Sequence, residues 1–246
     1  ESYRKLRNTV RYMLGALEGY AAEEAIGADK MPGLERWVLH RLSELDAQVR
    51  AAYNVYDFKK VMSLLINFCG VDLSAVYFDI RKDSLYCDPR FETAEAWDKA
   101  TAVFGNRRRA ARTVMAAVLE RLLTWLAPVM PFTMEEAFLE SHIKDSAASV
   151  HLLQFPDTPS GWQDAGLAAR WEKIFTVRRV VTGALEVERR EKRIGASLES
   201  SPRVLIADEA LIKAFKGEDA GDLFITSGAE LVHSSAGEGG GFTLDD

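Results

Sequence analysis

Arginine and lysine side chains gather at several places along this chain of 246 residues, and they are the residues with the most evident chemistry. Guanidinium groups donate paired hydrogen bonds to phosphates and base edges, and aromatic rings beside them can stack on unpaired bases. The candidate residues for contact with RNA are Arg4, Arg7 and Arg11, then Arg81, Lys82 and Tyr86, then Arg107, Arg108, Arg109 and Arg112, and finally Arg178, Arg179, Arg189, Arg190 and Arg193. An equally simple interpretation treats the clusters as solvated helix faces whose charges pair with nearby carboxylates.

The charge is divided unevenly along the chain. Residues Glu1 to Arg193 carry a net charge of +1, whereas the remainder carries -7, which gives the overall -6. Local positive patches on an acidic protein favour selective contact with RNA over indiscriminate binding to polyanions. From charge alone, RNA binding therefore stays one hypothesis beside a protein-interaction function.

No group of residues has the spacing of a catalytic or metal site. The four histidines are scattered, Cys69 lies in an apolar helical pattern, and Cys87 has no evident partner base. The glycine run Gly237–Gly241 lacks the Lys-Ser/Thr that follows a phosphate-binding loop. We therefore expect no catalytic residue, no metal ligand and no bound cofactor in this chain.

The elements that must position the basic residues are mainly helices. Apolar residues recur at three- and four-residue steps over about 3–17, from Pro32 to Val49, from Asp57 to Val76, and from near Ala94 to Leu126. Thr133 followed by Glu136 resembles the capping box that begins a shorter helix, and Leu85–Pro89 is typical of a turn. Long amphipathic helices with short connections predict an up-and-down bundle.

The composition changes near Ala196. A Pro-containing loop over 149–161 and a long basic helix over 164–193 precede two short β-type runs, at 203–207 and 229–233, with a short helix over 209–215 between them. The predicted fold class is mainly α, with a small α/β region after the bundle. The predicted divisions are 1–148 for the bundle, 149–195 for the connecting loop and basic helix, and 196–246 for the α/β region.

Composition also limits where the protein works. No uninterrupted apolar run approaches 18 residues, so we expect no membrane partner. Two cysteines without a CxxC pair favour a reducing, cytoplasmic setting over a disulfide framework. The first residues contain neither an initiator Met nor a signal peptide, which indicates a piece of a longer protein.

Four blocks of sequence resemble the anticodon-binding region of class I isoleucyl-tRNA synthetases. They are Ser2–Thr9, Tyr56–Phe58, Tyr77–Asp83 and Trp125–Thr133, the last followed by Glu135 and Glu136, and Arg193–Glu199 resembles the same family further on. The Trp-Leu-Ala-Pro block would also fit the valyl, leucyl and methionyl relatives. The Tyr-Phe-Asp-Ile-Arg-Lys-Asp block is the more specific isoleucyl signal.

The resemblance implies a helical-bundle domain that recognises the anticodon of isoleucine tRNA as part of a longer synthetase chain. It adds Asn8 to the RNA-contacting candidates, because Arg7 and Asn8 match the Arg-Asn step of the family's corresponding helix. The parent enzyme would use ATP and Mg²⁺ and would carry zinc. The His-Ile-Gly-His and Lys-Met-Ser-Lys-Ser signatures and the family's zinc-binding cysteines are absent from this chain. A sister synthetase specificity and a helical protein-interaction scaffold remain the alternatives.

Overall fold

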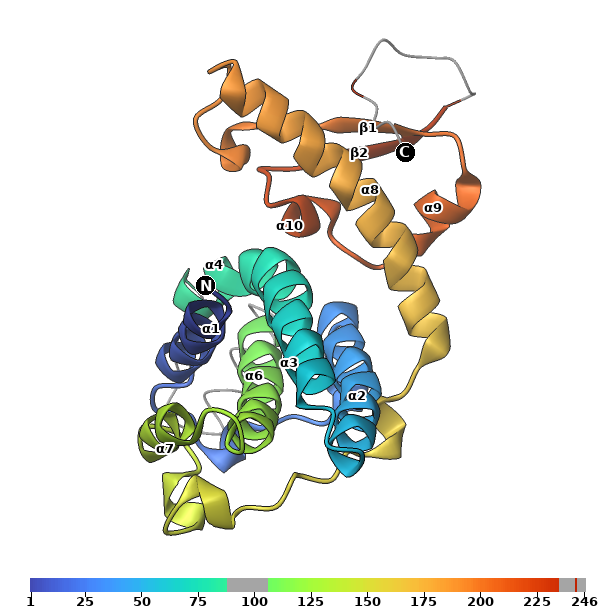
Figure 1. Cartoon of the computed structure of the whole chain (residues 1–246). Coiled ribbons are helices and arrows are strands. Elements are labelled where there is room, and N and C mark those ends of the chain that lie inside the picture. Colours follow the sequence, from blue (N-terminus) through green and yellow to red (C-terminus); the bar gives the residue numbers. More distant parts are fainter. Residues whose placement is uncertain (88–105, 235–241, 243–246) are drawn as a thin grey trace. The chain divides into compact units, whose positions relative to one another are not determined.

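The computed structural model describes residues 1–87, 106–234 and 242, and the chain divides into two compact units. The first unit is Glu1–Asp164 and the second is Ala165–Asp246. Helices account for most of the first unit, and the second combines helices with a small parallel sheet (Figure 1). This confirms the predicted fold class. The division falls after the Pro-containing loop, so the long basic helix belongs to the second unit.

The first unit is a bundle of α-helices with short 3₁₀ turns and one π-helical segment, η3 (Figure 1). Its elements are α1 (Ser2–Ala16), η1 (Ala22–Glu24), η2 (Ala28–Lys30), α2 (Gly33–Asn54), α3 (Phe58–Asn67), η3 (Phe68–Tyr77), α4 (Phe78–Cys87), α6 (Arg107–Leu126), α7 (Pro131–Leu139), η4 (Lys144–Ser146), η5 (Val150–Leu152) and η6 (Ser160–Trp162). The predicted start of the long fourth helix, near Ala94, lies outside the described residues.

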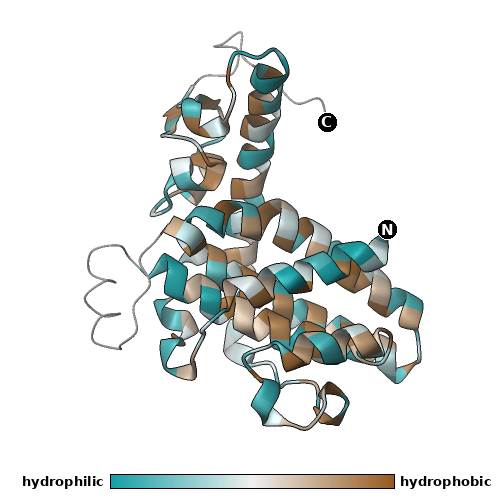
Figure 2. Ribbon diagram, turned by 90° about the vertical axis from the view of Figure 1, so that its left-hand side faces the viewer, coloured by the Kyte–Doolittle hydropathy of each residue, from teal (hydrophilic) through white to brown (hydrophobic). Residues whose placement is uncertain are grey.

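Helix α6 forms the centre of the bundle. It packs against α1, α2, α4 and α7, and its Leu119, Leu122 and Trp125 side chains are fully buried. The brown, hydrophobic residues of the surrounding helices contribute the rest of this core, while teal residues lie along the outer surfaces (Figure 2). Burial of these apolar faces is the main force that holds the helices in place.

Helices α3 and α4 form one continuous helix, because the π-helical segment η3 joins them without a break. The predicted third helix is therefore longer than its apolar pattern indicated, and the predicted turn is wrong as far as Cys87, since Leu85–Cys87 are helical. Residues 58–87 are long and apolar enough to span a membrane by length and hydropathy alone. Asp72 and Arg81 are nevertheless buried in this helix and make ion pairs with other helices, which is typical of the core of a bundle.

Helix α7 begins three residues earlier than predicted, and the predicted capping box is wrong. Pro131 is the first helical residue, and its fixed backbone angle favours that position. The Thr133 hydroxyl instead bonds the Tyr3 hydroxyl of α1, at 3.0 Å. The Glu135 carboxylate accepts hydrogen bonds from the Ser149 hydroxyl and the Val150 N–H, so it fixes the loop that follows α7.

The second unit contains α8 (Ala165–Arg190), η7 (Ser197–Glu199), β1 (Arg203–Ile206), α9 (Glu209–Ala214), α10 (Ala220–Phe224) and β2 (Glu230–His233). The strands pair in parallel, with Arg203 opposite Glu230 and Ile206 opposite His233. The long basic helix, both strands and α9 were predicted, whereas α10 was missed. Helix α10 is short, and its start depends on the Asp219 side chain, which caps the Asp222 N–H.

Candidate functional site

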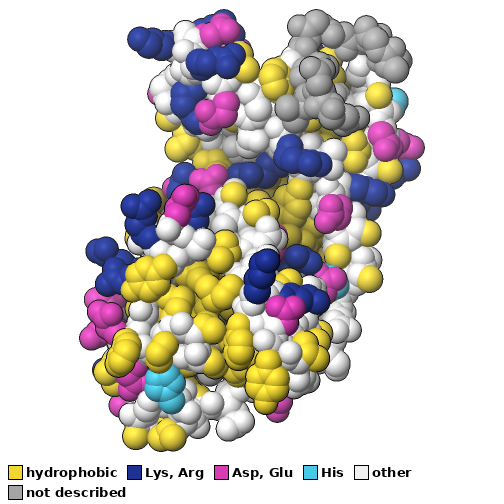
Figure 3. Space-filling model, in the orientation of Figure 1, with side chains coloured by type: hydrophobic (Ala, Val, Ile, Leu, Met, Phe, Trp, Pro, Cys, Tyr) yellow, Lys and Arg dark blue, Asp and Glu magenta, His cyan; other side chains and the backbone are white. Residues whose placement is uncertain are grey.

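The first helix carries a row of arginines on its solvent-facing side. Leu6, Val10 and Met13 point into the bundle, so Arg4, Arg7 and Arg11 are exposed. None of the three guanidinium groups has an ion-pair partner among the residues that the structure describes. Lys and Arg side chains gather around the end of the bundle where the N-terminus lies (Figure 3). This face can donate hydrogen bonds to phosphates without first breaking an internal salt bridge.

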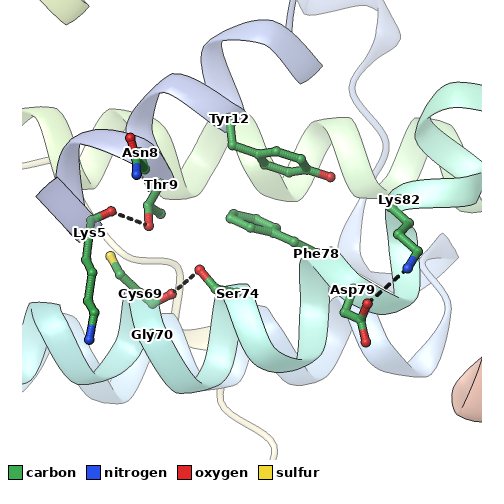
Figure 4. Close-up of a pocket in the computed structure, with 10 residues that line it drawn as sticks. All are labelled: Lys5, Asn8, Thr9, Tyr12, Cys69, Gly70, Ser74, Phe78, Asp79 and Lys82. Atoms are coloured by element: carbon green, nitrogen blue, oxygen red, sulfur yellow. Dashed lines mark hydrogen bonds and ion pairs between the residues drawn. The ribbon is translucent and has the colours of Figure 1, made fainter. Parts of the chain in front are cut away.

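A cavity of about 570 Å³ lies between α1 and the long helix formed by η3 and α4. Asn8 reaches it from α1 and Lys82 reaches it from α4 (Figure 4). These two residues were predicted from separate parts of the sequence, and the fold brings them to one site. The full set of lining residues is Lys5, Asn8, Thr9, Tyr12, Cys69, Gly70, Ser74, Phe78, Asp79 and Lys82.

Two aromatic rings form the wall of the cavity that is nearest α4. The Tyr12 and Phe78 ring centroids are 4.5 Å apart and the rings are tilted by 31° (Figure 4). The Lys82 ammonium pairs with the Asp79 carboxylate at 3.1 Å. An amide, a salt-bridged ammonium and aromatic rings in one hollow can hydrogen-bond and stack on an unpaired base.

Burial changes the acidity of two groups that line the cavity. It raises the pKa of the Tyr12 hydroxyl to about 12, and the nearby Tyr86 and Asp79 add to the rise. It also raises the pKa of the Cys69 thiol to about 12. Tyr12 is therefore a neutral hydrogen-bond donor at physiological pH, and Cys69 is an unreactive thiol, as its apolar pattern predicted.

The π-helical segment shapes the other side of the cavity. Its wider turns leave carbonyl groups without the usual α-helical partner, and the Ser74 hydroxyl donates to the Cys69 carbonyl at 2.7 Å. Gly70 also lines the hollow, with no atom within 4 Å of the position that a Cβ would occupy. Segments of π-helix are frequent at functional sites, where they alter the course of a helix locally.

Four of the arginines predicted to contact RNA are buried and have structural roles, and they are not part of the candidate surface. Arg81, only 3% exposed, forms a two-pronged ion pair with Glu35 of α2, at 2.7 and 2.9 Å. Arg112 pairs with Glu24 at 2.6 Å and donates to the Ala16 carbonyl at the end of α1. Arg108 donates to the Leu85 carbonyl, and Arg178 donates to the Leu223 carbonyl within the second unit.

The remaining predicted residues lie at or near the surface, but most have internal partners. Arg109 donates to the Glu24 carbonyl, and Arg107 is half-buried beside it. In the second unit, Arg189 pairs with Glu186, and Arg193 pairs with Glu188 and Glu191. Arg179 and Arg190 are exposed there, and Tyr86 is 63% exposed at the end of α4.

Several cavity residues were not predicted. Tyr12 follows Asn8 by four residues and Asp79 precedes Lys82 by three, so helical spacing places each beside a residue that was predicted. Phe78 likewise precedes Lys82 by four residues, whereas Thr9 and Ser74 carry no such signal, because only the packing of α1 on η3 brings them together. Among the described residues, no group of three or more His, Cys, Asp or Glu side chains could hold a metal ion.

Comparison with known proteins identifies the class of domain. The chain matches the model of the anticodon-binding domain of tRNA ligase over residues 35–205, which is most of its length. The chain belongs to this family. The match begins in α2 and ends in β1, so it covers part of each unit.

Several relatives that match the whole chain are isoleucine–tRNA ligases. The chain is 52% identical over 246 residues to that of Agrobacterium fabrum, 50% identical over 247 residues to that of Caulobacter vibrioides, and 48% identical over 246 residues to that of Brucella abortus. In each case all of this chain is matched, but it spans only 24% of the relative's length.

Proposed function

We propose that this chain recognises the anticodon of isoleucine tRNA as part of an isoleucine–tRNA ligase. The observation that carries the proposal is the cavity between α1 and α4. Asn8 and Lys82 line it together with Tyr12 and Phe78, next to the exposed arginines of α1, which have no ion-pair partner among the described residues. Anticodon bases are unstacked, and proteins read such bases through amide side chains, Arg forks and aromatic rings.

The proposed RNA-binding surface has two parts. Arg4, Arg7 and Arg11 line the outer face of α1, and Asn8, Lys82 and Tyr86 lie at or near the cavity. Arg179 and Arg190 of α8 and the ion-paired Arg189 and Arg193 are proposed as additional backbone contacts. The buried Arg81, Arg108, Arg112 and Arg178 hold the fold together, and Arg109 attaches the start of α6 to the Glu24 carbonyl.

The whole ligase would join isoleucine to its tRNA in the cytoplasm with ATP and Mg²⁺. The proposal places zinc, which the resemblance implies for the parent enzyme, outside this chain. The role of this chain is to bind and select the tRNA.

A titration of the 246-residue chain against unmodified transcripts of isoleucine, valine, leucine and methionine tRNAs tests the proposal. We expect the tightest binding for isoleucine tRNA. A preference for one of the other three would assign the chain to a sister synthetase. Undetectable binding to all four would favour the protein-interaction scaffold, and equal binding to all four would mean that the chain binds tRNA without reading the anticodon.

A further inference from the structure

An exposed aromatic row marks the turn between α2 and α3, which lies at the other end of the bundle from α4 (Figure 1). The Tyr56 side chain is 79% exposed and the Phe58 side chain 43% exposed. The Tyr56 ring lies 6.4 Å from the Phe58 ring, and Phe58 lies 5.8 Å from Tyr53. The cavity residues do not include any of these three, so the row is separate from the proposed anticodon site.

The inner end of this row is fixed in the core. The Tyr53 hydroxyl donates a hydrogen bond to the Trp125 carbonyl of α6, and the Tyr53 ring also packs on Phe155. The Phe155 ring in turn lies under the Arg50 guanidinium, at 5.6 Å. The two outer rings therefore project from a supported base, which lowers the entropy that is lost when something stacks on them.

The local charge favours an anion beside these rings. Lys59 and Lys60 are exposed and follow Phe58 directly, and neither ammonium has an ion-pair partner in the described part of the chain. The nearby Asp57 carboxylate accepts from the Lys60 N–H at 2.9 Å, so the start of α3 partly offsets its charge. Aromatic rings beside free lysines have the chemistry that binds a base and its phosphate.

We propose that Tyr56, Phe58, Lys59 and Lys60 form a second RNA contact, which stacks on an unpaired base of the bound tRNA outside the anticodon and neutralises the adjacent phosphates. The inference rests on the proposed tRNA-binding function. Phe58 begins one continuous helix and Lys82 lies in its last turns, about 36 Å away at a rise of about 1.5 Å per residue. This one helix would therefore fix the distance between the two proposed contacts with the RNA.

The test uses Tyr56→Asn in the 246-residue chain. Tyr56 has a φ of 59°, in the left-handed region that Asn tolerates, so this substitution removes the ring and keeps the turn. We expect isoleucine tRNA and an anticodon-altered transcript to lose affinity by the same factor, about 5- to 100-fold. Tyr56→Phe retains the stacking ring and should bind like the unaltered chain.

The lysines are tested by the salt dependence of binding. Lys59→Gln with Lys60→Gln should lower the slope of log K against log salt by about 1.5, and the control Lys213→Gln on α9 should leave it unchanged. Thermal unfolding of every variant shows whether the fold is kept. Unchanged affinity and slope in the Tyr56 and Lys59/Lys60 variants would overturn the inference and indicate a protein contact instead.

The two proposals fail in different ways. If the unaltered chain discriminates between anticodons but Tyr56→Asn binds normally, only the second contact is wrong. If the chain binds both transcripts equally and Tyr56→Asn weakens both, the second contact stands and anticodon reading fails. A loss that Tyr56→Phe shares would exclude stacking, and an absence of tRNA binding would overturn both proposals.

Discussion

At the scale of single residues, buried and exposed arginines of the same cluster have different roles. A cluster can be assigned a function only after its buried members have been separated from its exposed ones. Arg7 and Arg112 are indistinguishable as members of basic runs, yet Arg7 faces solvent and Arg112 is 4% exposed beside Glu24. The sequence predicted the positions of the helices that carry them. It could not show that Glu24, 88 residues away in sequence, would neutralise Arg112.

Arg112→Ala should destabilise the bundle by about 3–5 kcal/mol, because it leaves the buried Glu24 carboxylate unpaired. The change also removes donors from the Ala16 and Glu18 carbonyls at the end of α1. Chemical denaturation measures the difference. Arg11→Ala is the matched control on an exposed face and should change stability by less than about 0.5 kcal/mol. Equal effects of the two substitutions would contradict the assigned structural role.

Tyr12→Phe should lower the affinity for tRNA without destabilising the fold. The Tyr12 hydroxyl oxygen is buried at the cavity and has no hydrogen-bond partner among the described residues, so its removal leaves no protein group unpaired. We expect a free energy of unfolding that is unchanged or slightly higher, together with weaker binding. Full tRNA affinity in this variant would show that the RNA does not use the hydroxyl.

At the scale of elements, the pattern of apolar residues predicted most helices and both strands. The residues at which helices begin and end depend instead on local backbone preferences and on packing. Pro131 begins α7, where the sequence suggested a capping box at Thr133. The π-helical η3 continues the helix past the expected end, because packing against α1 and α2 compensates for its wider turns. Neither the π-helix nor the cavity beside it has a pattern that periodicity could detect.

The end of α8 stores strain at Lys192. Its φ is 59°, and the Lys192 N–H bonds the Arg189 carbonyl while the Arg193 N–H bonds the Glu188 carbonyl, which is the pattern of a C-cap that favours glycine. Lys192→Gly should therefore stabilise the second unit by about 1 kcal/mol. Thermal unfolding measures the stability of this variant and of a control, Lys173→Gly. The control places glycine inside the same helix and should be destabilising. A change in stability of the same sign in both variants would contradict the assignment of Lys192 as a strained C-cap residue.

At the scale of the whole molecule, buried tyrosines predict alkaline instability. Burial raises the pKa of Tyr53 to about 12, and burial also raises the pKa of the fully buried Tyr77. The unfolded chain loses these protons from about pH 10. Their contribution to stability is thus complete below pH 10 and is lost as the pH rises towards 12. Denaturation between pH 9 and 12 should show this fall. The fall should be smaller in Tyr53→Phe, and an identical pH dependence would contradict the prediction.

At the scale of the whole molecule, the proposed function assigns binding and selection of RNA to this chain and amino-acid activation to the rest of the ligase. We expect no isoleucine-dependent pyrophosphate exchange from the 246-residue chain, because its sequence lacks the His-Ile-Gly-His and Lys-Met-Ser-Lys-Ser signatures of the synthetase family. Exchange above background would contradict this. The absence of nucleotide-binding signatures was readable from the sequence, whereas the separation of structural from exposed arginines required the fold.

The central claim is that the cavity between α1 and α4, with the adjacent Arg7, reads the anticodon. The most direct test measures the affinity of the unaltered chain, Arg7→Ala and Asn8→Ala for isoleucine tRNA and for the same tRNA with an altered anticodon. We predict that the unaltered chain prefers isoleucine tRNA, and that each substitution reduces the preference by about 1–3 kcal/mol, the value of one good base contact. Equal losses for both tRNAs would make the two residues backbone contacts, and an undiminished preference would contradict the claim.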